Sequence, residues 1–170
     1  IVHDLEKPLE IKRKFDLVQS LEVAEHLRPE FAAPFIKNLC TLSDLVLFSA
    51  AIPAQGGLNH FNEQYPEYWI SLFSQNNFSA YDSLRKNIWN HKLIDTCYRQ
   101  NILLFVRNEV RHRYPAFTLA EEPILNLVHP ETYDVRNRII RDYEKITSNV
   151  FHANWYIAKK GIKKILKKIG

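Results

Sequence analysis

Short apolar runs alternate with segments of helical periodicity in the first third of the chain. The run Phe15–Ser20 follows a stretch of basic residues and predicts a buried strand, and Ser20 is placed to cap a helix after it. A second helical segment covers Phe31–Leu42, and the continuous apolar run Asp44–Ile52 is typical of a parallel strand covered on both faces. The apolar residues that share one face of the first helix are Val23, Ala24 and Leu27. This pattern predicts a β–α–β unit with two parallel strands.

A long loop, a helix and two more strands follow. The loop between Pro53 and Pro66 holds the adjacent glycines, and loops of this length inside a compact domain are often functional. The large residues after it have helical spacing: Tyr68, Trp69, Leu72 and Phe73. Strands are predicted at Phe78–Leu84 and Asn101–Val106, and the polar stretch between them is too short and irregular for a crossover helix, so we expect antiparallel pairing. The predicted fold class is α/β, with a mostly parallel sheet that ends in an antiparallel hairpin.

The charge of the chain changes after residue 134. Residues 1–134 carry 13 basic and 17 acidic side chains, whereas residues 135–170 carry 10 basic and 2 acidic ones. We therefore expect a folded domain over 1–134 and a basic helical tail over 135–170. Near its end six lysines surround an apolar stripe formed by Ala158, Ile162, Ile165, Leu166 and Ile169. Such a helix is expected to contact an anionic membrane surface through residues 158–170, the alternative being a terminal helix docked weakly on its own domain.

Composition excludes several classes of protein. The chain has no apolar run long enough to span a bilayer and no signal-peptide pattern at its start. Cys40 and Cys97 lie far apart in apolar contexts, which suits buried thiols in a reducing compartment, so we expect a cytoplasmic protein, peripheral at the inner membrane if the tail binds there. The folded part lacks the basic, aromatic-interleaved surface of a nucleic-acid binder, so no nucleic acid is expected as a partner. Because Ile1 opens a chain without Met, we expect a longer reading frame.

Acidic and histidine residues follow the first predicted strand, at the sheet edge where ligands bind in open α/β sheets. On a helix, Glu22, Glu25 and His26 would stand at i, i+3 and i+4 and project from one face. His60 would lie near them, because the long loop that holds it leaves the sheet at the same edge. Two carboxylates and two imidazoles suit a divalent ion such as Mg, Mn, Fe or Zn. Without an ion, these residues form a solvated or hydrogen-bonded cluster, or one histidine acts as a general base.

Three stretches of the sequence resemble class I S-adenosylmethionine-dependent methyltransferases. They are His3–Leu5 continued by FDLVQSLEVAEHL, then DLVLFSAAIPAQGGLNHFNEQYPEYWISLF, and finally YRQNILLF, so the resemblance covers most of residues 1–107. It implies a Rossmann-like methyltransferase sheet in which Val2–Leu5 ends the third strand, FDLVQS is the fourth and DLVLFSAAI the fifth. The last two predicted strands would be the sixth and seventh, paired as an antiparallel hairpin. The residues that the resemblance places against the cofactor are Asp4, Leu5, Ser20 and Leu21.

Part of the family pattern has no match in the chain. The glycine-rich turn after the first strand is absent, and so is the acidic residue that ends the second strand and holds the ribose. We therefore expect the N-terminal strands of the sheet to be missing from this sequence and the cofactor pocket to be incomplete. Neither G-x-S-x-G nor G-x-G-x-x-G occurs, which disfavours a hydrolase or a dehydrogenase.

The E-x-x-E-H spacing with a later loop histidine is similar to the metal-binding pattern of small-RNA 2′-O-methyltransferases and ubiquinone-pathway O-methyltransferases. It implies that Glu22, Glu25, His26 and His60 bind a divalent metal and that His26 and His60 serve catalysis. We expect methylation of an oxygen on a small molecule such as a sugar or glycan precursor, although the same scaffold would also serve a nitrogen acceptor. The alternative is a catalytically incomplete binding or scaffold module derived from the same fold.

Overall fold

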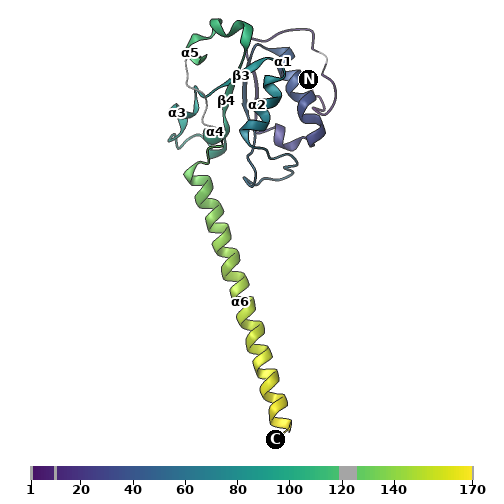
Figure 1. Cartoon of the computed structure of the whole chain (residues 1–170), viewed down its shortest axis with the longest axis vertical. Coiled ribbons are helices and arrows are strands. Elements are labelled where there is room, and N and C mark those ends of the chain that lie inside the picture. The colour runs from purple at the N-terminus through teal and green to yellow at the C-terminus, as the bar shows by residue number, and fades with distance from the viewer. Residues whose placement is uncertain (1, 10, 119–125, 170) are drawn as a thin grey trace. The chain divides into compact units, whose positions relative to one another are not determined.

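Four short strands form one mixed sheet in the computed structural model of the chain (Figure 1). They are β1 (Val18–Leu21), β2 (Leu45–Ser49), β3 (Phe78–Tyr81) and β4 (Leu103–Arg107). Strands β1 and β2 are parallel, and β4 lies between β2 and β3 and is antiparallel to both. The structure describes residues 2–9, 11–118 and 126–169, without the side chains of Thr118, His152 and residues 161–169.

The sheet confirms the α/β class, the β–α–β unit and the antiparallel pairing of the last two strands. It corrects the expectation of a mostly parallel sheet, because one of its three pairings is parallel within the part of the chain that the structure describes. The reason is the insertion of β4, which runs against both of its neighbours. The strands are also shorter than the apolar runs that predicted them, since residues 50–52 are buried without belonging to a strand.

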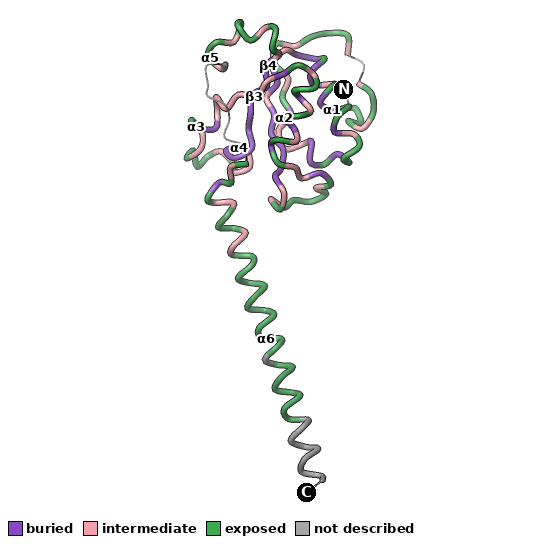
Figure 2. Tube along the Cα trace, in the orientation of Figure 1, coloured by how far each residue is buried: buried purple, intermediate pink, exposed green. Residues whose placement is uncertain are grey.

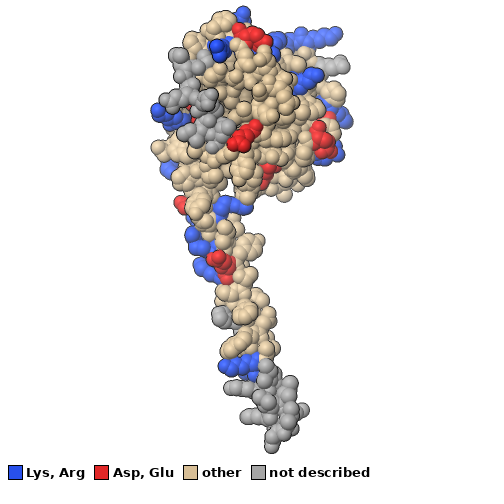
Figure 3. Space-filling model, viewed as in Figure 1, with Lys and Arg blue, Asp and Glu red and all other residues tan. Residues whose placement is uncertain are grey.

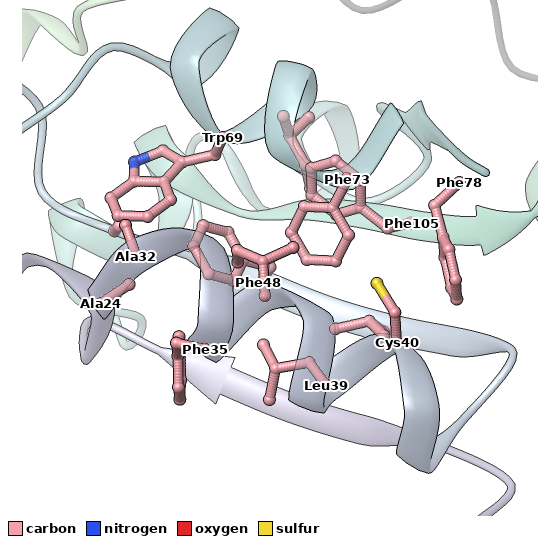
Figure 4. Close-up of a cluster of buried hydrophobic side chains, with 14 of the residues drawn as sticks. Ala24, Ala32, Phe35, Leu39, Cys40, Phe48, Trp69, Phe73, Phe78 and Phe105 are labelled. Atoms are coloured by element: carbon pink, nitrogen blue, oxygen red, sulfur yellow. The ribbon is translucent and has the colours of Figure 1, made fainter. Parts of the chain in front are cut away.

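Helices α1 (Ala32–Leu42) and α2 (Pro66–Ser74) pack over one face of the sheet. Phe73 of α2 stacks on Phe105 of β4 with ring centroids 3.7 Å apart, and Trp69 lies 5.3 Å from Phe48 of β2 (Figure 4). Burying an aromatic side chain of this size contributes roughly 1.5–3 kcal/mol. The main core therefore lies between β2, β4 and these two helices.

The opposite face of the sheet carries a second, smaller core. Along β4 the side chains alternate, so that Leu103 and Phe105 join the main core while Leu104 and Val106 join the second. Tyr114 and Phe117 pack on this second face, from the segment formed by η3 (Asn108–Arg113) and α5 (Pro115–Thr118). Coverage on both faces explains why this strand is apolar at every inner position.

Two short helices, α3 (Arg85–Ile88) and α4 (Thr96–Asn101), occupy the stretch between β3 and β4 that the sequence predicts to be irregular. Buried arginines hold this segment together. Arg85 forms an ion pair of 2.7 Å with Asp82, and Arg99 donates hydrogen bonds to the carbonyls of Trp89 and Ile94. Because charged groups are buried only when paired, these residues have a structural role.

The segment Val2–Leu5 is not a strand, contrary to the resemblance. The backbone turns here, since the Lys7 N–H donates to the Asp4 carbonyl, and the Asp4 carboxylate lies 3.4 Å from the Lys7 ammonium. A strand needs hydrogen-bonding partners on a neighbouring strand, and among the described residues β1 pairs with β2 alone. The turn is held to the rest of the fold by Glu6, whose carboxylate lies 2.6 Å from the Arg28 guanidinium.

Residues 130–170 form a second unit, separate from residues 1–129. It consists of helix α6 (Pro130–Ile169), which begins five residues before the predicted boundary, and a proline is well suited to the first position of a helix. From Arg138 to Lys160 every described side chain of α6 is exposed (Figure 2). The side chains of Ile162, Ile165, Leu166 and Ile169, which complete the predicted apolar stripe, lie outside the described residues. No helix in the described part of the chain is both long and apolar enough to cross a membrane.

Candidate functional site

The site begins where the parallel strands β1 and β2 end. The N–H of Glu22 donates to the carbonyl of Ser49 at 3.0 Å and so continues the ladder one residue beyond β1. Glu22 itself has a φ of 52°, a left-handed conformation that costs about 1–2 kcal/mol for a residue with a side chain. Ala54 and Asn59, in the loop after β2, are left-handed as well. Strained backbone of this kind tends to gather at functional sites.

The helix predicted from Ser20 onward does not form. Ser20 belongs to β1, and η1 (Ala24–His26) is a single 3₁₀ turn. The carbonyl of Glu25 accepts hydrogen bonds from the N–H groups of Phe61 and Asn62, each at 2.9 Å, instead of continuing a helix. Arg28 precedes a proline and is therefore extended, and a second 3₁₀ turn, η2 (Pro29–Phe31), follows before α1.

Glu25, His26 and His60 come together at this edge of the sheet. One potential ligand atom from each residue lies within 4.8 Å of the other two. The two imidazole rings meet edge to face, with centroids 4.7 Å apart. The structure thus brings together three of the four residues predicted to bind a metal, although their shared position does not depend on a common helix face.

The carboxylate of Glu25 is the most unusual group in the site. Its side chain is fully buried, and neither of its oxygens has a hydrogen-bond partner in the described part of the chain. Burial raises the pKa of this carboxyl group and the nearby Glu22 carboxylate adds to the rise, while its own backbone N–H and the neighbouring His26 and His60 act in the opposite direction. Burying a carboxylate without partners is costly, so this geometry favours a bound cation or a bound proton.

Both imidazoles use the same ring nitrogen for structural contacts. The Nδ1–H of His26 donates to the carbonyl of Asn59 at 3.2 Å, because a carbonyl oxygen can only accept. Nδ1 of His60 lies 2.9 Å from Oε1 of Glu63. In both residues Nε2 is therefore the nitrogen left to bind a metal or accept a proton.

Glu22, the fourth residue predicted to bind a metal, lies outside the group formed by Glu25, His26 and His60. Its carboxylate accepts hydrogen bonds from the side-chain amides of Gln55 at 2.9 Å and Asn101 at 3.1 Å. Asn101 also donates to Gln55, and the buried Gln100 bonds to both. Because the backbone of Glu22 is left-handed and not helical, its side chain is directed to this amide network instead of joining Glu25.

Sequence reasoning missed two residues that hold His60. Glu63 accepts hydrogen bonds from the N–H groups of Ala54 at 2.7 Å and Gly56 at 2.9 Å in addition to His60. Burial raises the pKa of Glu63, but these hydrogen bonds outweigh it and leave the pKa below its ordinary value. A Cβ atom on Gly57 would lie 2.1 Å from Nε2 of His60, so only glycine leaves room for the ring. The local sequence signals were the glycine pair and the i, i+3 spacing of His60 and Glu63.

The four residues that the resemblance places against the cofactor lie in two separate parts of the structure. Ser20 and Leu21 lie at the end of β1, and the Ser20 hydroxyl is buried without a hydrogen-bond partner in the described residues. Asp4 and Leu5 are exposed in the N-terminal turn and do not extend the sheet toward Ser20. Among the described residues, the structure therefore offers an unpaired polar group at the end of β1 and no acidic strand end beside it.

Burial disfavours the thiolate form of both cysteines. Burial raises the pKa of Cys40 to about 12 and that of Cys97 to about 11. Both are free thiols, Cys40 buried in the main core and Cys97 half-buried in α4. A nucleophilic cysteine needs a lowered pKa, so neither residue is a candidate nucleophile.

Comparisons with known proteins give one partial structural match. No protein-family profile matches the sequence, and no curated protein does. Among solved structures, the chain is similar to magnesium protoporphyrin IX methyltransferase (ChlM) from Synechocystis PCC 6803 with bound SAH. The TM-score is 0.45 at 20% identity, and the match covers 64% of this chain and 50% of that chain. The chain thus spans about half the length of this neighbour.

Proposed function

We propose that the chain forms the acceptor side of an S-adenosylmethionine-dependent methyltransferase that binds a divalent metal ion. The ligands are Glu25, His26 and His60, and the acceptor is a hydroxyl group of a small molecule such as a sugar or glycan precursor. Mg, Mn, Fe and Zn all suit one carboxylate with two imidazoles.

One observation carries this proposal: the buried Glu25 carboxylate has no hydrogen-bond partner in the described part of the chain and lies beside two imidazoles. Their contacts with Asn59 and Glu63 leave both Nε2 atoms available. A metal ion would satisfy the carboxylate and both nitrogens at once, which no residue described around them does. The donor set therefore fits the ion that the E-x-x-E-H spacing implies.

The methyltransferase class rests on the sequence resemblance, and the sheet supports it. The antiparallel pair β3–β4, beside a parallel β1–β2 pair, is the feature that the resemblance requires of the last strands. The cluster lies at the carboxyl ends of the parallel strands, where open α/β sheets bind ligands. Ser20, with its unpaired hydroxyl at the same strand end, would face the methyl donor.

Methyl transfer to oxygen needs alignment and removal of one proton. When bound, the metal would supply positive charge that lowers the pKa of the acceptor hydroxyl, and S-adenosylmethionine would supply the methyl group. The oxygen forms a bond to the methyl carbon, the carbon–sulfur bond breaks, and its electron pair stays on sulfur. The hydroxyl proton passes to solvent while Nε2 of His26 and of His60 hold the ion, and in the alternative without an ion one of these two nitrogens would accept it.

Calorimetric titration of Mn²⁺ and then Zn²⁺ into the 170-residue chain tests the metal site. We expect one site per chain, lost in Glu25→Gln and retained in Glu30→Gln, because Glu30 is exposed and lies outside the cluster. Absence of binding in the wild-type chain would overturn the metal part of the proposal.

The methyltransferase part is tested separately, with protein produced from the complete reading frame that contains these residues. It should transfer a radiolabelled methyl group from S-adenosylmethionine to an acceptor with a free hydroxyl, and chelators should abolish transfer. Titration of S-adenosylmethionine into the 170-residue chain is expected to show weak binding or none, since the glycine-rich turn is absent. If the complete protein binds neither the cofactor nor an acceptor, the chain belongs to a binding or scaffold module instead.

A second proposal concerns the end of α6, which we assign to peripheral contact with an anionic membrane. The Lys and Arg side chains described on α6 fall in two groups, separated by the uncharged stretch 146–158 (Figure 3). This stretch exposes Phe151, Trp155 and Tyr156, and Lys159 lies 4.5 Å over the Trp155 ring. Exposed aromatic side chains followed by lysines suit the boundary between lipid headgroups and acyl chains.

A further inference from the structure

Glu63 lies where the loop between β2 and α2 folds back on itself, next to the predicted ligand His60. Its carboxylate is four-fifths buried and accepts three hydrogen bonds. Oε2 accepts from the N–H of Ala54, and Oε1 accepts from the N–H of Gly56 and contacts Nδ1 of His60. Neither the sequence motif nor the comparisons give this residue a role.

From this geometry we infer that Glu63 is the positioning residue of His60, a role that rests on the metal site proposed above. Backbone N–H groups can only donate, so both oxygens of Glu63 must act as acceptors. Nδ1 of His60 must therefore carry the proton of their shared hydrogen bond. This fixes the tautomer in which Nε2 is unprotonated and free to bind a metal. Metal-binding histidines commonly donate their second ring N–H to a carboxylate in this way.

The loop fixes His60 from a second side as well. The His60 ring occupies the space that a Cβ atom on Gly57 would need. Phe61 and Asn62, the next two residues, donate their N–H groups to the carbonyl of Glu25. The loop is therefore tied to the Glu25 backbone on one side of His60 and closed by Glu63 on the other, so the ring has little freedom to turn.

Glutamine at position 63 would break this arrangement without changing the size of the side chain. A carboxylate presents two acceptor oxygens, whereas an amide presents one acceptor and one donor group. In Glu63→Gln, the amide NH₂ would face either a backbone N–H or the Nδ1–H of His60, and two donors repel each other. We expect His60 to lose its single tautomer and its fixed orientation.

The first measurement uses the metal-free, ¹⁵N-labelled 170-residue chain. Long-range ¹H–¹⁵N correlation spectra at about pH 8, where an ordinary histidine is neutral, report which ring nitrogen carries the proton. We expect His60 to be protonated at Nδ1 in the wild type and to show a mixture of tautomers in Glu63→Gln. The matched control is Glu67→Gln, because Glu67 is an exposed residue of α2 whose carboxylate contacts Asn126. The control should keep the wild-type pattern.

The second measurement is Mn²⁺ affinity by calorimetry on the same three proteins. We expect Glu63→Gln to weaken binding by about 10–100-fold, with an unchanged unfolding temperature. Unchanged tautomer and unchanged affinity in this variant would overturn the inference. If the wild type binds no metal while its tautomer depends on Glu63, the metal proposal fails and the positioning role stands.

A second variant keeps the test decisive if Glu63→Gln does not fold. Glu63→Asp retains the charge but withdraws the carboxylate by one methylene, and it should shift the tautomer of His60 in the same direction. A single Nδ1–H tautomer in Glu63→Asp, together with wild-type Mn²⁺ affinity, would contradict the positioning role.

Discussion

The imidazole rings of His26 and His60 meet edge to face at a centroid distance of 4.7 Å, although they belong to different segments of the chain. His26 ends the 3₁₀ turn after β1, and His60 lies in the loop after β2. Because β1 and β2 are parallel, both segments leave the sheet at the same edge. Each ring donates through Nδ1, so Nε2 is the nitrogen of each ring that can still bind a metal or accept a proton.

Substitutions of the three predicted ligands distinguish a metal site from a general base. In the complete protein, Glu25→Ala, His26→Ala and His60→Ala should each reduce methyl transfer severely if the residues share one ion, and chelation should have the same effect. His112→Ala, an exposed histidine on η3, is the control. If only one histidine variant loses activity, by about 10²–10⁴-fold, and chelators have no effect, that histidine is a metal-free base. Loss of stability in all three would mark a structural cluster.

Glu25→Gln should be tolerated by the metal-free chain. The wild type buries a carboxylate without hydrogen-bond partners in the described residues, so removing the charge should cost less than about 1 kcal/mol of unfolding free energy. Saturating Mn²⁺, at about 100 times its dissociation constant, should stabilise the wild type by about 2.7 kcal/mol and leave the variant unchanged. Thermal unfolding with and without metal measures both effects. A large loss of stability without metal would contradict the absence of hydrogen-bond partners for the Glu25 carboxylate.

Glu22→Ala should act on stability more than on metal binding. The substitution leaves the side-chain NH₂ of Gln55 without its acceptor, while Asn101 keeps the Gln55 oxygen as an acceptor, and we expect a cost of about 1–3 kcal/mol of unfolding free energy. Chemical denaturation measures this loss, and calorimetry should show a smaller fall in Mn²⁺ affinity than for Glu25→Ala. The opposite result, with metal binding abolished at unchanged stability, would show that Glu22 is a ligand.

The Asp44 carboxylate makes the stability of the sheet depend on pH. Hydrogen bonds from Arg107 at 2.7 Å and Lys14 at 3.2 Å hold the pKa of Asp44 below its ordinary value, against the opposing effect of burial. Because the pKa is lower in the folded state, the stabilisation is complete above the unfolded pKa of about 3.9 and disappears as pH falls through the folded pKa. Asp44→Asn should therefore destabilise the chain by about 1 kcal/mol at pH 7 and by less toward pH 3. Denaturation curves over this range test it, and a constant difference would contradict it.

Deletion of residues 158–170 should release the chain from anionic vesicles without changing the fold of residues 1–129. Each lysine contributes about 1 kcal/mol near an anionic surface, and salt weakens this attraction. Co-sedimentation with phosphatidylserine-containing vesicles at low salt measures the effect, with neutral vesicles as the control. Failure of the intact chain to sediment would refute membrane contact. Dimerisation in analytical ultracentrifugation, together with that failure, would show that α6 binds a second copy.

Local pattern determined most of the elements. The runs around Val46 and Leu104 are continuous because both faces of their strands are buried, and the spacing of Trp69 and Phe73 places both on the buried side of α2. These features depend on residues close in sequence, so periodicity reveals them. The basic composition after residue 134 likewise predicted a separate helical segment, and α6 begins five residues before that boundary.

Tertiary contacts decided what lies between those elements. Glu22 and Glu25 have the spacing of one helix face, yet hydrogen bonds from Phe61 and Asn62 to the Glu25 carbonyl replace the helix with a single 3₁₀ turn. That change directs Glu22 to Gln55 and Asn101 and leaves Glu25 with the two histidines. The role of Glu63 was hidden for the same reason, because it depends on how the loop closes around His60. The residue types alone identified the candidate residues of the site, while long-range backbone hydrogen bonds selected which of those residues meet.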